Sequence, residues 1–158
     1  MSKRGVWLFV VLFILLISSI VRAEDPVDQE GTNPDDVKTF PGDPPTKVTG
    51  DPGATKTDTG VKLSSGTEVS GFSDIVVSGS EVIVNGQRIS GATYIKNEGG
   101  VIVTDGATTV KADGSQDIIA THVQTFQAGP VVITNGVNVK YINGCLSADS
   151  ADSLIETD

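Results

Sequence analysis

The chain of 158 residues is predicted to fold as an all-β protein, because turn signals, β-branched residues and the absence of a helical period agree. Three words of eight residues, GSEVIVNG, GGVIVTDG and GPVVITNG, begin at Gly79, Gly99 and Gly129. Val, Ile and Thr favour strands, and the closing Asn-Gly or Asp-Gly pairs favour hairpin turns, which need positive φ angles. We therefore expect a small antiparallel hairpin or meander domain, sandwich-like or barrel-like, with a β-solenoid as the alternative.

The first 23 residues have the features of a secretory signal peptide. Lys3 and Arg4 precede an uncharged segment, residues 5–21, and the small residue Ala23 closes it. At 17 residues this segment is short for a span of the bilayer, which takes about 20. We expect cleavage after Ala23, with a membrane anchor through residues 5–21 as the alternative. In both cases we expect the rest of the chain to be extracellular.

Residues 24–60 are predicted to be a disordered linker. They hold six of the seven prolines and almost no large apolar side chains. Such a segment buries too little apolar surface to offset the entropy lost on ordering. The β-rich repeat domain is then expected to span residues 61–145, followed by an acidic flexible tail over residues 146–158.

Within the domain, the repeated words predict three hairpins. They are expected near residues 81–90, 101–112 and 131–142, with positive φ at Gly86, Gly106 and Gly136. A fourth, shorter hairpin is expected to turn at residues 78–80. Residues 115–126 also fit a short helix in part, but their Thr and Val content favours a strand.

The predicted strands carry apolar side chains on both faces, so a second layer must cover one of them. Ile102 and Val132 occupy the same position in two of the words. In an isolated sheet one face would meet water, and a core of about 85 residues is small for independent stability. A sandwich or a second copy of the chain is therefore expected against these side chains, and self-association becomes a hypothesis.

The charge and composition exclude some partners. The chain has 11 basic and 20 acidic residues, a net charge of −9, and loss of Lys3, Arg4 and Arg22 would leave 8 against 20, or −12. A phosphate backbone would repel this charge, so no nucleic-acid partner is expected. Cys145 is the single cysteine, so no internal disulfide forms, and both an intermolecular disulfide and a buried thiol stay open.

No motif in the sequence assembles a recognisable reaction centre. His122 is the only histidine, and neither Cys145 nor any serine lies in a nucleophile motif. The loop Asp113–Asp117, DGSQD, is rich in oxygen ligands but lacks the spacing of a calcium loop, so an ordinary turn is expected. Gly99 and Gly100 precede no helix and form no phosphate loop. We expect no catalytic, cofactor or metal site.

The sequence therefore predicts a secreted, non-catalytic structural, surface or matrix module that can self-associate. An extracellular binding module for a protein or glycan is the first alternative, and it would need an exposed aromatic cluster such as Phe72, Tyr94 and Tyr141. A small secreted hydrolase is the second, and it would need His122 beside an acid and a nucleophile.

Overall fold

The computed structural model describes residues 36–157, which form a sheet of 15 strands and contain no helix, so no membrane-spanning helix occurs among them. The all-β prediction is confirmed. The strands are β1 (Val37–Phe40), β2 (Thr46–Thr49), β3 (Thr55–Lys56), β4 (Val61–Lys62), β5 (Glu68–Ser70), β6 (Asp74–Ser78), β7 (Glu81–Val84), β8 (Gln87–Ser90), β9 (Tyr94–Glu98), β10 (Val101–Asp105), β11 (Ala107–Lys111), β12 (Asp117–Ala128), β13 (Val131–Ile142), β14 (Cys145–Ser147) and β15 (Ser153–Glu156).

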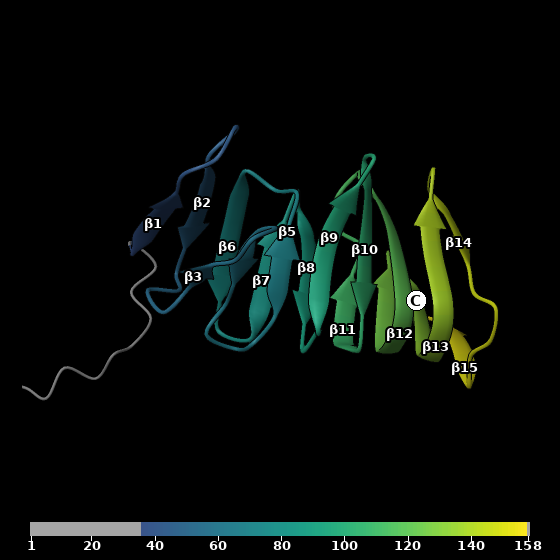
Figure 1. The fold of residues 1–158 in the computed structure, drawn as a ribbon. Helices are drawn as coiled ribbons and strands as arrows, with labels where there is room; N and C mark the ends of the chain where they lie inside the picture. The colour runs from purple at the N-terminus through teal and green to yellow at the C-terminus, as the bar shows by residue number, and fades with distance from the viewer. Residues whose placement is uncertain (1–35, 158) are drawn as a thin grey trace, which may run out of the picture. The chain divides into compact units, whose positions relative to one another are not determined.

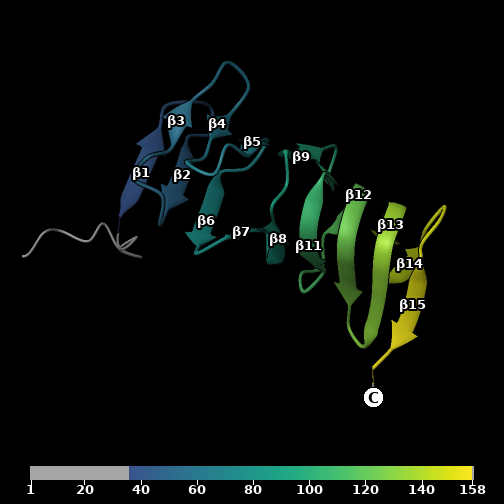
Figure 2. The same cartoon turned by 90° about the horizontal axis from the view of Figure 1, so that it is seen from below.

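The sheet is nearly closed and barrel-like, because two arms meet on strand β12. Arm A has the order β1-β2-β6-β7-β8-β11, and arm B has the order β3-β4-β5-β9-β10. The first part of β12 pairs with β10 and its later part with β11, both in parallel. The long strand β13 pairs along β12, as Figures 1 and 2 show. Buried residues of both arms form a single hydrophobic core.

Glycines bend the chain where it passes from one arm to the other. β5 leads into β6 through Gly71, β8 into β9 through Gly91, and β10 into β11 through Gly106, all with positive φ. A Cβ atom at Gly91 would lie 2.3 Å from the Oγ1 atom of Thr108, and one at Gly71 would lie 2.8 Å from the carbonyl oxygen of Asn97. Only glycine meets both the backbone angle and the close approach. We call this line of bends the crease.

β-branched side chains from both arms fill the core. Ile89 of arm A and Ile95 and Ile102 of arm B are fully buried. Val132, in contrast, is half-buried on the opposite side of its strand from Ile133. The predicted equivalence of Ile102 and Val132 is therefore wrong. Cross-strand partners share a face: Ile102 pairs with the buried Ile118, whereas Val132 pairs with Gln127, which lies between the buried Phe126 and Ala128.

Two of the four predicted hairpins are confirmed. Asn85 and Gly86, with φ of 48° and 80°, turn β7 into β8, and residues 78–81 turn β6 into β7. Two further hairpins join β9 to β10 at Gly99–Gly100 and β12 to β13 at Gly129–Pro130. The fold is thus largely antiparallel, with four parallel pairings among the described strands.

The predicted hairpins at 101–112 and 131–142 are wrong. β10 and β11 each pair with β12 and not with each other, so Gly106 is a bend of the crease. β13 runs without interruption through Gly136, whose φ is not positive. The strand over residues 115–126 is confirmed as part of β12. In both wrong cases a longer-range pairing with β12 replaces the local one.

The predicted boundaries of the domain are too narrow at both ends. Residues 36–60 contain β1–β3 and bury Phe40, Val48 and Ala54, so the linker prediction is wrong there. β14 and β15 pair with β13, so the prediction of a flexible tail over 146–158 is wrong for the described residues. Short strands gain backbone hydrogen bonds from the sheet despite few apolar residues. The predicted signal peptide, residues 1–23, and residues 24–35 of the predicted linker lie outside the described residues.

The buried acid Asp51 fixes part of the segment that was predicted to be a linker. The carboxylate of Asp51 accepts hydrogen bonds from the N–H groups of Gly53 and Ser64, at 3.1 and 2.7 Å, and from the Ser64 hydroxyl. These bonds join the turn after β2 to the chain that follows β4. Residues 51–64 are thus integrated into the fold.

Candidate functional site

His122 and Asp105 lie side by side along the crease. His122 belongs to β12 and Asp105 ends β10, and their parallel pairing brings together residues that are 17 apart in the chain. The Nδ1 atom of His122 is 2.8 Å from the Oδ1 atom of Asp105. The His122 side chain is 65 % exposed and that of Asp105 is 34 % exposed. The pair is therefore open to solvent.

A shallow pocket of about 310 Å³ adjoins this pair. It is lined by Gly106, Ala107, His122, Val123, Gln124 and Asn135. The lining contains an imidazole and two amides but no serine, threonine or cysteine. Cys145 is exposed on β14, not in this lining. His122 thus has the acid that a catalytic triad needs, while the pocket supplies no nucleophile.

The loop Asp113–Asp117 does not gather its carboxylates around a common centre. Asp113 Oδ2 is 3.5 Å from Arg88 Nε, and Asp117 Oδ1 accepts a hydrogen bond of 2.8 Å from the Asn143 N–H. The predicted ordinary turn is therefore the better description of DGSQD. No group of three His, Cys, Asp or Glu side chains among residues 36–157 is arranged to hold a metal ion.

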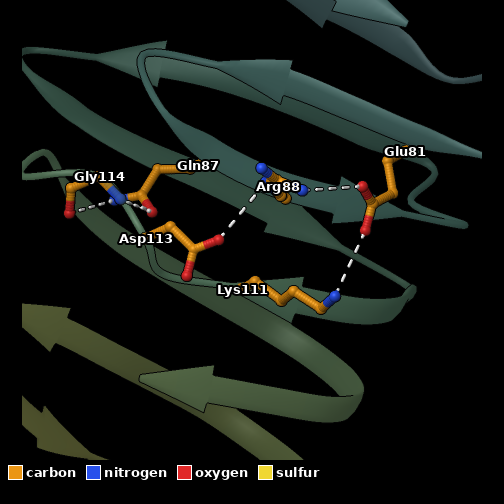
Figure 3. Close-up of polar contacts among 6 residues, drawn as sticks. All are labelled: Glu81, Gln87, Arg88, Lys111, Asp113 and Gly114. Atoms are coloured by element: carbon orange, nitrogen blue, oxygen red, sulfur yellow. Dashed lines mark hydrogen bonds and ion pairs between the residues drawn. The ribbon is translucent and has the colours of Figure 1, made fainter. Parts of the chain in front are cut away.

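Side-chain amide groups, one of them buried, hold this loop in place. Gln87 is fully buried; its Oε1 atom accepts from the Gly114 N–H at 3.0 Å, and its Nε2 atom donates to the carbonyl oxygens of Gly114 and Gln116. Figure 3 shows the contact with Gly114. The Gln116 side chain donates in turn to Asn97 and to the carbonyl of Gly100. This amide cluster ties the β7–β8 turn of arm A to the β9–β10 turn of arm B.

A charged network covers the surface of β7, β8 and β11. Arg88 and Lys111 stand opposite each other on neighbouring strands, where two cations would repel. Glu81 lies 3.7 Å from Arg88 and 3.6 Å from Lys111, and Asp113 adds a third contact, as drawn in Figure 3. The two acids balance the two bases. These partly exposed ion pairs stabilise a sheet surface and leave no surplus charge for a ligand.

The three aromatic residues named for a binding surface do not share one. Phe72 is buried, while Tyr141 packs partly buried against the core. Tyr94 is half-buried on the opposite side of its strand from the core residue Ile95, with Lys96 Nζ 4.7 Å from its ring centroid. The aromatic cluster that a binding module was expected to need is not formed.

The most distinctive surface lies at the free edges of the sheet. Among the strands of residues 36–157, β1 ends arm A, β3 ends arm B, and β14 and β15 each pair only with β13. The exposed large hydrophobic side chains of the described residues are Val37 on β1 and Leu154 and Ile155 on β15. Sequence reasoning missed this site because linker and tail compositions concealed the strands. The available signal was the apolar residues within two short segments, Val37 and Phe40 in VKTF and Leu154 and Ile155 in SLIE.

Comparison of the chain with known family models, with curated proteins and with solved structures gives no match.

Proposed function

We propose that this chain is a secreted, non-catalytic structural module of a surface or matrix, and that it acts by assembling with further copies. The observation that supports this most directly is the location of Val37, Leu154 and Ile155 on edge strands. Edge strands offer unpaired backbone groups, and soluble proteins usually protect them with charges, bulges or covering segments. Apolar side chains at an open edge favour pairing with another strand.

The interior polar groups support the same proposal, because they act within the fold. The buried polar side chains within residues 36–157 are those of Asp51, Thr67, Gln87 and Thr104. Each of them is hydrogen-bonded to another part of the chain. Catalytic sites usually keep polar groups free to meet a substrate. Here these groups fix turns and strand ends.

Size-exclusion chromatography with light scattering tests the proposed function. The full chain is expressed with its own N-terminal segment, and mass spectrometry identifies the N-terminus of the purified protein. We expect a mass above that of one chain, rising with concentration and unchanged by reductant. A dependence on reductant would assign the association to Cys145 instead. A monomer at every concentration would contradict assembly.

A binding module for a polar ligand such as a glycan is the second candidate. The pocket beside His122 carries Gln124 and Asn135, whose amides both donate and accept hydrogen bonds. Its small volume and open position make it suited to one sugar unit rather than to a large ligand. A monomeric chain that binds glycans through this pocket would favour this candidate over assembly.

A further inference from the structure

We propose that copies of this chain join head to tail, the β15 edge of one copy pairing with the β1 edge of the next. The proposal rests on the proposed structural function and specifies its interface. The partner is a second copy of the same chain, and the contact is a strand pairing that continues the sheet.

β1 and β15 are the two ends of one continuous run of strands. Arm A leads from β1 to β11, and β11 pairs with the later part of β12. The later part of β12 pairs with the start of β13, which in turn pairs with β15. Each antiparallel pairing in this run reverses the strand direction and each parallel pairing keeps it. The pairings together leave β1 and β15 pointing in the same direction. If a second copy is added in the same orientation, its β1 would therefore pair in parallel with β15 of the first copy, as β2 and β6 pair within one chain.

The core is left uncovered at the β15 end. Leu154 is the cross-strand partner of Ile133, so both side chains point to the core side of the sheet. Ile133 is 1 % exposed, whereas Leu154 is 66 % exposed. The core therefore stops one strand short of the edge. A further strand, packed with its own inward side chains, would cover Leu154.

The β1 end supplies suitable inward side chains. Lys38 pairs with the fully buried Val48 and thus points to the core side, as does Phe40 two residues later. The Lys38 Nζ atom donates to the Ala54 carbonyl at 2.7 Å, which leaves its aliphatic stem along this edge. Phe40 is already buried within its own copy, so the exposed apolar stem of Lys38 is the surface that remains to cover the leucine.

The two ends differ in charge. Residues 36–62, which contain β1–β4 and their connections, hold four lysines and four aspartates, so their charges balance. β15 and the chain that joins it to β14 contain Asp149, Asp152 and Glu156 and no basic residue. Head-to-tail pairing places this acidic edge beside Lys38 of β1, in a region without surplus negative charge. A two-fold pairing of β15 with β15 would bring like charges together, which is unfavourable.

Cysteine cross-linking tests this interface in the full chain with Cys145→Ser. Val37 and Ile155 both point away from the core side, so they would share a face of the joined sheet. One variant carries Val37→Cys and the other Ile155→Cys, and the two are mixed under mild oxidation. We expect the mixed disulfide between the two variants to dominate. Thr39→Cys and Ser153→Cys, two residues away on the same faces, allow for a shift in register.

Gln124→Cys serves as the matched control, because Gln124 is exposed on β12, a strand with neighbours along both edges. It should cross-link with Ile155→Cys at the background rate. A dominant Ile155→Cys homodimer would overturn the proposal in favour of a two-fold dimer, while the proposed structural function would stand. A chain that assembles without any cross-link between these strands would overturn the interface alone. A monomeric chain would overturn both proposals.

Leu154→Lys gives a second readout that does not depend on cysteine. The side chain is exposed in the single chain, so the variant should keep its β-rich circular dichroism. Loss of its apolar contact is expected to raise the dissociation constant about tenfold or more. Gln124→Lys adds the same charge away from the edge and should leave assembly unchanged. Unaltered assembly of Leu154→Lys would contradict the pairing.

Discussion

Asn85–Gly86 and Asn135–Gly136 are the same dipeptide at the end of the same kind of word, yet the chain folds differently around each. At Asn85–Gly86 both residues have positive φ, and the chain reverses from β7 into β8. At Asn135–Gly136 only Asn135 has positive φ, 47°, and β13 continues. The dipeptide therefore permits a reversal without enforcing one.

The contacts around each dipeptide account for the difference. Gly86 lies against Gly114, in the loop that Gln87 fixes, so the reversed turn is held from outside. Gly136 is buried, and a Cβ atom there would lie 2.3 Å from a methyl group of Val139. β12 also pairs with β13 on both sides of Gly136. A strand with a long partner gains more backbone hydrogen bonds by continuing than by turning.

The largest expected effect comes from removing the support of the Asn85–Gly86 turn. Gln87→Ala leaves the partly buried Gly114 N–H and Gln116 carbonyl without their partner and opens a cavity where the buried Gln87 side chain lay. We expect a loss of about 3 kcal/mol in the free energy of unfolding. Urea denaturation followed by circular dichroism measures it. A loss comparable to that of an exposed substitution, such as Gln124→Ala, would show that the amide cluster does not hold the turn.

A medium effect should separate the two glycines. Asparagine tolerates positive φ, so Gly86→Asn is expected to cost about 1 kcal/mol or less, despite the nearby Gly114. Gly136→Asn places a side chain into the packed contact with Val139 and Ile133, and about 2–3 kcal/mol should be lost by overpacking. Thermal melts of both variants measure the order. The reverse order would show that the contacts of Gly136 with Val139 and Ile133 do not exclude a side chain.

The smallest effect concerns the side chain that precedes Gly136. Asn135 Nδ2 donates to Asp152 Oδ2 at 2.7 Å, next to the start of β15. Asn135→Gly keeps the positive φ and removes this exposed bond, so the global cost should stay below about 1 kcal/mol. We expect faster amide hydrogen exchange in β15, measured by mass spectrometry, with β7 and β8 unchanged. Equal exchange in β15 would show that the strand is held without Asn135.

The candidate site shows where sequence reasoning was limited. His122 was identified as the only imidazole, but its pairing with Asp105 depends on β10 lying beside β12, which no local pattern indicates. The edge strands β1 and β15 were concealed in proline-rich and acidic segments. β15 pairs with the start of β13, while β1 pairs with the adjacent β2, which itself depends on its parallel pairing with the more distant strand β6. The composition of a segment indicates how much apolar surface the segment can bury by itself. It does not indicate the backbone hydrogen bonds that the segment gains by pairing with a sheet.

The sequence by itself determined the all-β class, the strand character of residues 115–126 and the turn at Asn85–Gly86, because β-branched side chains and positive-φ residues act through local sterics. The tertiary structure alone decided that Gly106 would bend a strand and that Gly136 would lie within one. It also decided that residues 36–60 and 145–156 would join the sheet. These outcomes depend on hydrogen bonds between strands far apart in the chain. The free energy of such bonds is a property of the assembled sheet and not of any single segment.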